Sequence, residues 1–347
     1  MHVAILCNQV VSELAAHDVD VHVQREAVAD ALTQLGHRVS RLECSLDLSS
    51  LDRQLADLRA DIVFNLVENL GGSDRLMALV TMLLEARRIP FTGAGTRAIL
   101  SSGSKLMAKD QMRLVGLPTA DWYEPGVGWH LEPGGRVPDR VICKSVWEHA
   151  SVGIDDDAVT EVTSEEACDA WFRERSGHVE HEMMLEAFVA GREFNLSALQ
   201  GADGRPSCDV LPPAEIDFSM FPAGKPQIVG YEAKWNAGSA EYQLTPRRFD
   251  FAESDQTLLA QLRTLTEACW RLFGLSGYAR VDFRIDTKGQ PYILEVNANP
   301  CLSPDAGFAA ALQQAELPFE RAIERILVGG LCRGTPSNGS PASAQHR

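Results

Sequence analysis

The stretch from residue 278 to residue 303 constrains the fold of this chain more than any other. Charged residues alternate with apolar ones from Arg280 to Ile285. From Tyr292 to Asn297, Tyr292, Leu294 and Val296 alternate with Ile293, Glu295 and Asn297. This is the period-2 pattern of β-strands. The residues between these runs, Asp286-Thr-Lys-Gly289, are typical of a turn. The sequence therefore predicts two strands joined into a hairpin.

The register of this hairpin decides which polar side chains meet. With a four-residue loop at 286–289, Asp282 is expected opposite Ile293, and Arg280 opposite Glu295. Directly opposed residues of two strands share a face of the sheet. We therefore expect four polar residues to converge on one side of the hairpin: Arg280, Asp282, Glu295 and Asn297.

Two carboxylates and an amide oxygen on one face form a hard, all-oxygen set of donors. Such a set suits Mg²⁺, which takes few protein ligands and completes its octahedron with water and phosphate oxygens. Arg280 beside them has the charge to hold a phosphate or a developing oxyanion. A surface hairpin with a salt-bridged polar face is the alternative. We favour a metal site formed by Asp282, Glu295 and Asn297, because the polar face runs into a loop rather than a new element.

Composition limits the classes of protein that this chain can represent. Its 347 residues are enough for a large core and two or three domains. The net charge of −16 argues against a general nucleic-acid binder, although a local lysine and arginine lining can still hold an anionic nucleotide. The sequence has no apolar run long enough to span a membrane and no signal peptide. The eight cysteines are scattered without a C-x-x-C pair, which indicates reduced thiols and a cytoplasmic location.

The first part of the chain alternates strand and helix patterns. Strands are expected at 3–7, 39–42 and 62–67, and helices at 22–36, 49–59 and 74–87. Short links between alternating strands and helices predict an α/β unit with a parallel sheet. Ligands of such sheets gather at the carboxyl ends of the strands, here near Asn8 and Glu68.

The rest of the chain mixes helices, strands and a long polar loop. Helices are expected at 104–116, 164–175, 255–273 and in parts of 305–327; strands at 140–144, 184–189 and 194–199; a loop or small ribbon at 124–139; and a mobile loop at 222–241. Residues 333–347 contain only small and polar types, so we expect a disordered tail.

A set of charged residues and short motifs, taken in order, resembles the ATP-grasp superfamily and within it the D-alanine–D-alanine ligases. The set consists of Lys105, Lys144, Glu186, Gly191-Arg-Glu193, Lys234, Arg280-Val-Asp282 and Glu295-Val-Asn297. Ile89-Pro-Phe-Thr-Gly-Ala-Gly95, Glu148-His-Ala-Ser-Val-Gly153 and Tyr231-Glu-Ala-Lys-Trp235 match further motifs of the family. The resemblance covers roughly residues 60 to 328.

This resemblance implies an α/β protein of ATP-grasp architecture, in which two α+β subdomains clasp ATP. The expected units are an N-terminal α/β domain at 1–96, a central subdomain at 97–185 and a C-terminal subdomain with the metal site at 186–332, followed by the tail at 333–347.

The resemblance also implies roles in nucleotide binding. Lys105 and Lys144 would contact the phosphates of ATP or its adenine region. Glu186 would meet the adenine amino group beside a backbone amide near Val189, and Glu193 would bind the ribose hydroxyls.

Roles in the chemistry follow in the same way. Ser151 would cover the terminal phosphates, Lys234 would reach the γ-phosphate and Arg280 would steady the tetrahedral intermediate. Two Mg²⁺ ions, with Mn²⁺ as an alternative, would be held by the three ligands named above. Cations around the γ-phosphate and an oxyanion site are what phosphoryl transfer to a carboxylate requires.

The sequence departs from the family where the family binds D-alanine. Glu68 replaces a histidine, Ala150 and Ala306 replace serines, Trp235 replaces a tyrosine and Cys301 replaces a glycine. Glu68 is a candidate for binding a substrate ammonium, or a helix-capping or solvated acid. Trp235 is a loop anchor or a lid, and Cys301 is a small residue packed in a loop. We therefore expect a different acid and amine, with a second substrate that lacks a carboxylate near Ala306 or has it held by other groups.

These observations predict an ATP-dependent carboxylate–amine ligase that acts through an acyl phosphate and releases ADP and phosphate. A non-catalytic ATP-binding relative, a kinase that stops at the acyl phosphate and an authentic D-alanine–D-alanine ligase are the alternatives. The expected partners are a small-molecule carboxylate and an amine, without nucleic acid or membrane, in a chain that forms a homodimer.

Overall fold

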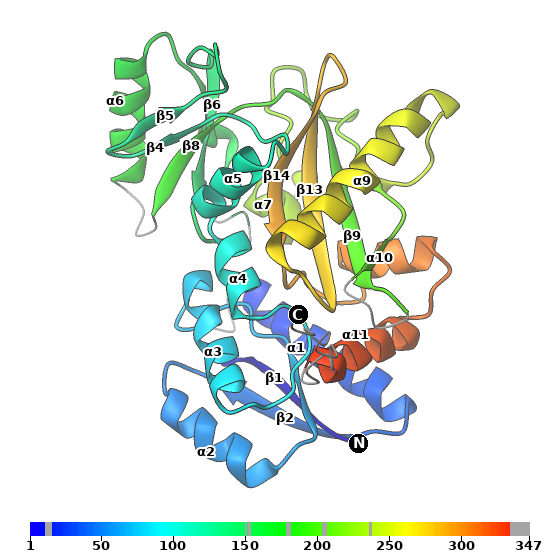
Figure 1. The fold of residues 1–347 in the computed structure, drawn as a ribbon. Helices are drawn as coiled ribbons and strands as arrows, with labels where there is room; N and C mark the ends of the chain where they lie inside the picture. The colour runs from blue at the N-terminus through cyan, green and yellow to red at the C-terminus, as the bar shows by residue number, and fades with distance from the viewer. Residues whose placement is uncertain are drawn as a thin grey trace, which may run out of the picture.

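The computed structural model describes residues 1–10, 16–149, 151, 154–177, 182–202, 207–235 and 238–333, and all structural statements concern these residues. Their strands form three sheets, which lie in separate lobes of the molecule (Figure 1). No helix among the described residues is long and apolar enough to cross a membrane.

The first lobe is the expected parallel α/β unit. Its three-stranded sheet has the order β2-β1-β3, with β1 (His2–Asn8), β2 (Arg38–Cys44) and β3 (Ile62–Asn65). Its helices are α1 (Ala16–Gln34), α2 (Leu48–Leu58), the 3₁₀ turn η1 (Asp74–Met77) and α3 (Ala78–Ala86). Every residue of β1 is buried, as its apolar run predicts. Helix α1 begins six residues earlier than expected, because the polar start of its sequence hides the helical pattern.

The second lobe carries an antiparallel sheet of five strands in the order β5-β4-β8-β6-β7. The strands are β4 (Trp122–Glu124), β5 (Gly128–His130), β6 (Arg140–Ser145), β7 (Val159–Glu161) and β8 (Met183–Ala187). The 3₁₀ turn η2 (Asp156–Ala158) leads into β7, and α6 (Glu165–Ser176) buries Cys168 and Phe172 against the sheet. Helices α4 (Thr96–Gly103) and α5 (Lys105–Leu114) connect this lobe to the first (Figure 1).

The third lobe contains the predicted hairpin at the edge of an antiparallel six-stranded sheet. Strands follow the order β12-β11-β9-β13-β14, with β10 also pairing with β9. They are β9 (Gly191–Gln200), β10 (Cys208–Val210), β11 (Ala214–Ile216), β12 (Arg247–Arg248), β13 (Tyr278–Asp286) and β14 (Pro291–Asn297). The 3₁₀ turn η3 (Glu253–Asp255) precedes α9 (Gln256–Phe273), whose apolar face packs on the sheet. The loop expected to be mobile at 222–241 contains α7 (Tyr231–Trp235) and the start of α8 (Ala240–Gln243).

The register predicted for the hairpin is wrong, by one residue beside the turn and by two residues at the polar side chains. Asp282 lies opposite Glu295 rather than Ile293, and Arg280 lies opposite Asn297 rather than Glu295. The first residue of this shift arises at the turn, because Ile285 pairs with Pro291 rather than Gln290. The second comes from a β-bulge, because β14 has one extra residue, Leu294, between the pairs that flank it. The bulge leaves Asp282 directly across from Glu295, so these two carboxylates still share a face.

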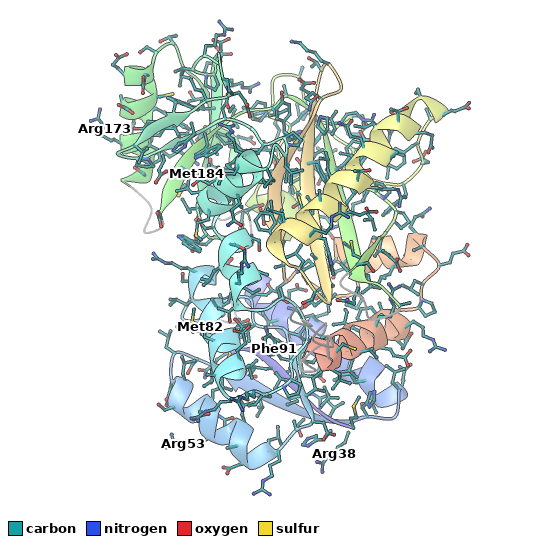
Figure 2. The ribbon with its side chains drawn as sticks, in the orientation of Figure 1. Arg38, Arg53, Met82, Phe91, Arg173 and Met184 are labelled. Carbon is teal, nitrogen blue, oxygen red and sulfur yellow. The ribbon has the colours of Figure 1, made fainter. Side chains whose placement is uncertain are left out.

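The end of the described chain returns to the first lobe. Helix α10 (Gly307–Gln314) is followed by α11 (Phe319–Arg333), whose buried side chains join one apolar core with β1 and α1. In Figure 2, Phe91 and Met184 lie inside the molecule, whereas Arg53 and Arg173 extend outward from its surface. The expected domain boundaries stay a prediction, and the tail at 334–347 lies outside the described residues.

Candidate active site

A cavity of about 540 Å³ lies between the sheet of the second lobe and the sheet of the third. Ten of the residues predicted as site residues line it: Lys105, Lys144, Ser151, Glu186, Val189, Glu193, Lys234, Arg280, Asp282 and Glu295. They come from strands β6, β8, β9, β13 and β14, from α5 and α7, and from the loops between these elements. Residues far apart in the sequence therefore meet in one cavity.

Glu186 is held by two lysines at one end of the cavity. Glu186 lies opposite Ile142 in the sheet, and Lys144, two residues further along β6, is on the same face and contacts its carboxylate. Lys109 Nζ lies 2.6 Å from Glu186 Oε2, and the side chains of Lys109 and Glu186 are almost completely buried. Burial opposes ionisation, but the two lysines outweigh it and lower the pKa of Glu186 below its usual value.

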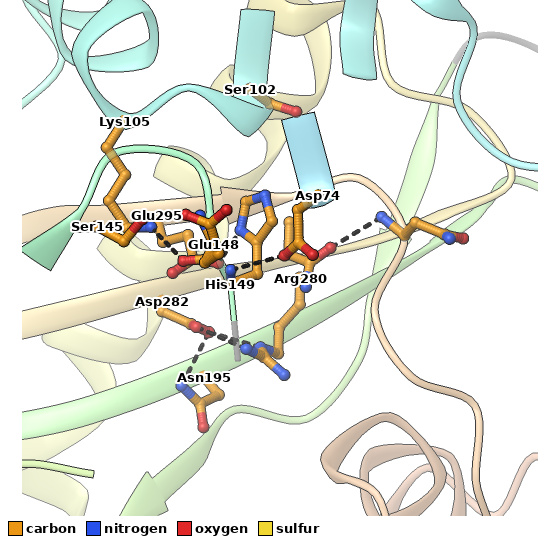
Figure 3. Close-up of polar contacts among 12 residues, drawn as sticks. Asp74, Ser102, Lys105, Ser145, Glu148, His149, Asn195, Arg280, Asp282 and Glu295 are labelled. Carbon is orange, nitrogen blue, oxygen red and sulfur yellow. Dashed lines mark hydrogen bonds and ion pairs between the residues drawn. The ribbon is translucent and has the colours of Figure 1, made fainter. Parts of the chain in front are cut away.

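The loop after β6 is held by Lys105. Its Nζ donates to the carbonyl oxygen of Glu148 over 2.8 Å, and the Glu148 carboxylate contacts the Ser145 hydroxyl (Figure 3). These contacts fix the turn that leads to His149 and Ser151. Ser151 has a positive φ of 59°, and its hydroxyl donates to the carbonyl oxygen of Val229 over 3.0 Å.

His149 connects this loop to the hairpin. Its Nδ1 lies 2.5 Å from Glu295 Oε1, and its backbone N–H donates to Asp74 Oδ2 over 2.9 Å (Figure 3). Lys234 Nζ donates to the carbonyl oxygen of His149 over 3.0 Å. Burial opposes ionisation of Glu295, yet His149 and Lys105 lower the pKa of its carboxyl far below the usual value.

Arg280 and Asp282 form a second charged group on the same face. Arg280 Nε and Nη2 donate to the two carboxylate oxygens of Asp282 over 2.7 and 2.8 Å. Asn195 lies opposite Asp282 on β9 and donates to Oδ1 over 2.8 Å (Figure 3). Burial opposes the charge on Arg280, but Asp282 and Glu295 raise its pKa above the usual value, so the guanidinium stays charged.

Glu193 lies in the cavity beside a buried arginine. Its Oε2 is 3.5 Å from Arg284 Nε, and Arg284 also donates to the carbonyl oxygens of Gly191 and Gln227. Burial raises the pKa of Glu193, and Arg284 opposes this shift. The arrangement leaves a carboxylate acceptor in the wall of the cavity, two residues along β9 from Asn195.

Four predicted site residues do not line the cavity through described side chains. Asn297 Oδ1 accepts from the backbone N–H of Asn299 over 2.9 Å. Cys301 donates to Asp20 Oδ2 over 2.8 Å, and burial together with Glu68 and Asp20 raises its pKa well above the usual value. The thiol is therefore a poor nucleophile at neutral pH.

Glu68 and Trp235 complete the predicted set. Glu68 Oε1 accepts from Gln24 Nε2 over 2.6 Å, and burial raises the pKa of the Glu68 carboxyl to about 7. Trp235 ends α7, and its side chain is not among the described ones. Ala150, one of the departures noted above, also lies outside the described residues.

The donors on the hairpin fit Mg²⁺ by their chemistry. Asp282 and Glu295 are opposed carboxylates on the cavity face, and Mg²⁺ sites commonly use one or two carboxylates with phosphate and water oxygens. The described residues contain no cluster of three or more histidine, cysteine or acidic side chains arranged around a metal position. An Mg²⁺ ion held by these two carboxylates would take its remaining ligands from phosphate and water oxygens.

The sequence did not predict several residues that line the cavity or contact its lining. Lys109, His149, Asn195, Arg247 and Arg284 were not predicted to act there. A lysine in an amphipathic helix gives no signal of burial, and an arginine in a strand gives none of its partner. His149 had a signal, because it stands within the predicted phosphate-covering loop between Glu148 and Ser151.

Known proteins are similar to this chain in sequence and in fold. Residues 136–328 match the family described as D-ala D-ala ligase C-terminus. The D-alanine–D-alanine ligase of Synechococcus sp. (strain JA-3-3Ab) is 28% identical to this chain, over 93% of each chain. The D-alanine–D-alanine ligase of Anaeromyxobacter dehalogenans is 31% identical to it, over 87% of this chain and 89% of the relative. A D-alanine–D-alanine ligase of Bacillus anthracis solved with ATP has a TM-score of 0.71 at 17% identity, covering 96% of this chain and 98% of that one.

The fold and the cavity define an ATP-dependent ligase of ATP-grasp architecture that forms carbon–nitrogen bonds from small molecules. The chain belongs to the D-alanine–D-alanine ligase family, since the family match covers more than half of it and a relative is 31% identical along most of its length. The predicted fold class and ligase activity are thereby confirmed.

Proposed function

We propose that this ligase phosphorylates a carboxylate with ATP and Mg²⁺ to an acyl phosphate, which an amine then attacks to give an amide. The observation that carries the proposal is the convergence of Lys144, Lys234, Arg280, Asp282 and Glu295 on one cavity. Phosphoryl transfer depends mainly on positioning and on stabilising charge, and this lining supplies both cations and anions for that purpose.

The end of the cavity around Glu186 receives the base and ribose in this proposal. Lys144 and Glu186 offer a donor and an acceptor there, beside the backbone at Val189, and Glu193 offers an acceptor for the ribose hydroxyls. Phe188 and Ile142 line the same cavity and supply apolar surface for a flat ring. Lys105 and Ser151 hold the loop that lies over the phosphates.

The hairpin end holds the reacting groups. Asp282 and Glu295, with Asn297 nearby, are the proposed ligands for two Mg²⁺, which would offset phosphate charge when bound. Lys234 is half-buried, and desolvation together with the charge of Arg280 lowers its pKa. Its Nζ donates to the carbonyl oxygen of His149, and in this proposal it reaches the γ-phosphate. Arg280 is oriented by Asp282 and is placed to stabilise the oxyanion that forms when the amine attacks.

D-alanine is the first acid and amine to test, because the relatives are named for it. The replacements at Glu68, Trp235, Cys301 and Ala306 make a related but different pair of substrates our preferred alternative. Incubation with ATP, Mg²⁺ and a panel of amino acids, followed by mass spectrometry, identifies the product. A cytoplasmic location and a homodimer are further parts of the proposal.

The metal assignment is tested by Glu295→Gln. The change keeps the size of the side chain and removes a negative charge from the cavity. We expect Mg²⁺-dependent ADP release to fall by at least about 100-fold, with the circular dichroism spectrum unchanged. Glu267→Gln on the exposed side of α9 is the matched control and should keep full activity. Near-normal turnover of Glu295→Gln in saturating Mg²⁺ contradicts the assignment.

A further inference from the structure

Arg247 lines the cavity, and the proposed mechanism leaves it without a role. It lies on β12, where it is opposite Ile216, and the next residue, Arg248, is opposite Glu215. Successive residues of a strand point to opposite faces of the sheet. Ile216 and Arg247 both line the cavity, whereas Arg248 Nη2 is 2.9 Å from Glu215 Oε2 on the other face. The strand therefore directs one arginine into the cavity and the other into an ion-pair network.

The guanidinium of Arg247 lies against the start of α10. Its Nη1 is 3.3 Å from the carbonyl oxygen of Asp305, and its Nε is 3.4 Å from the position that a Cβ on Gly307 would occupy. Among the residues that the structure describes, no carboxylate forms an ion pair with Arg247. Ala306, the residue before α10, gives the helix no side-chain cap. The guanidinium of this cavity-lining arginine thus lies beside the amino end of α10.

Two positive charges, Arg247 and Arg280, and one carboxylate, Asp305, act on each other here. Arg247 is an exposed residue at the edge of the cavity, but partial desolvation of its guanidinium and the nearby charge of Arg280 lower its pKa, while Tyr242, Asp305 and Cys301 oppose the shift. Arg280 is already bound to Asp282, so it does not supply Arg247 with an anion. A guanidinium remains charged in proteins, and its planar donors match a carboxylate in a two-point contact. The wall is suited to an anionic group of a ligand.

We propose that Arg247 binds a carboxylate of the amine substrate, and this inference rests on the proposed ligase function. The family resemblance places the group that meets this carboxylate at Ala306, whose methyl group has no hydrogen bond to offer. From β12, Arg247 lies against the backbone on either side of Ala306, at Asp305 and Gly307. Of the two expectations for the second substrate, the structure favours a carboxylate held by a different group over the absence of one.

The test compares amines with and without a carboxylate. Purified full-length protein is given ATP, Mg²⁺ and D- and L-amino acids, each paired with its own amide derivative as the acceptor. ADP release and mass spectrometry give kcat and KM for every acceptor that yields a product. We expect wild-type protein to prefer the carboxylate member of a pair. Arg247→Met should raise the KM for that member by about 10- to 100-fold and leave the KM for ATP unchanged.

Two further variants separate binding from folding. Arg248→Met is the matched control, since it removes the same charge from the other face of β12 and should preserve the preference. Arg247→Lys keeps the charge without the planar fork and should give an intermediate KM. An unchanged carboxylate preference in Arg247→Met, with product still formed, overturns the inference alone. The absence of any amine-dependent product from wild-type protein overturns the proposed ligase function and the inference with it.

Discussion

Several charged residues of the site are buried beside a residue of opposite charge, and this pairing determines their protonation. Lys109 and Lys144 neutralise Glu186, and His149 accompanies Glu295. Removing one member of a buried pair leaves an uncompensated charge, which is costly. Glu68 differs, because the described partner of its carboxylate is the neutral side chain of Gln24, and burial raises its pKa. Its protonation is therefore sensitive to pH near neutrality.

Glu68 should make the stability of the protein depend on pH. Its pKa rises from an ordinary value of 4.5 to about 7 on folding, so the folded state holds the proton more tightly than the unfolded state. Stability then falls as pH rises from about 4.5 to 7, by about 3 kcal/mol in total. Glu68→Gln should remove this fall, as urea unfolding at several pH values would reveal. Exposed Glu253→Gln serves as the control, and parallel wild-type and Glu68→Gln curves would contradict the assignment.

At the scale of elements, the position of the site depends on strands β9, β13 and β14. Asn195 on β9, Asp282 on β13 and Glu295 on β14 lie side by side across three strands. The bulge at Leu294 sets which residues of β14 face the cavity. A shift of one residue in either pairing would turn the carboxylates to the other face of the sheet. The register of these strands therefore determines the position of the carboxylates as much as the identity of the site residues does.

Gly191 is the tightest point in this pairing. It begins β9 opposite Asp286 with a φ of +143°, and a Cβ there would lie 2.0 Å from the carbonyl oxygen of Ile285. Gly191→Ala should destabilise the protein by roughly 2–4 kcal/mol, because backbone rather than a flexible side chain must move. Gly36→Ala, at φ +80° with no atom within 4 Å, isolates the cost of the backbone conformation and should lose only about 1 kcal/mol. Thermal unfolding compares the two variants, and equal losses would show that overlap is unimportant.

The sequence predicted most elements but not the details that place the site. Alternation revealed β13 and β14, since their side chains follow the two faces of a sheet. The bulge escaped prediction, because no local signal marks Leu294 as the extra residue. Helix α4 was missed because Ser101, Ser102 and Gly103 are weak helix formers, and tertiary packing stabilises them instead. Lys109 and Arg247 acquire their positions from contacts distant in the sequence, which periodicity does not report.

At the scale of the whole molecule, the two ends of the described chain form one core. Helix α11 packs on α1 and β3 in the first lobe, and also contacts β9 of the third. Ile323, Ile326 and Leu327 are completely or almost completely buried there. A Cβ on Gly330 would lie 2.7 Å from the carbonyl oxygen of Phe91, so the helix approaches the first lobe closely. The C-terminal helix thus ties the first lobe to the lobe that carries the hairpin.

Removal of α11 should therefore unfold more than the end of the chain. A chain that stops at Leu317 loses Ile323, Ile326 and Leu327 from the shared core, each worth about 2–5 kcal/mol, together with the smaller Ala322. Their sum is comparable to the total stability of a protein domain, about 5–15 kcal/mol. We expect loss of the cooperative thermal transition and loss of ATP-dependent turnover, although every residue of the cavity is retained. A chain that stops at Arg333 keeps the whole of α11 and is the matched control. A cooperative transition within a few degrees of that control would show that the first lobe holds together without its helix from the far end of the sequence.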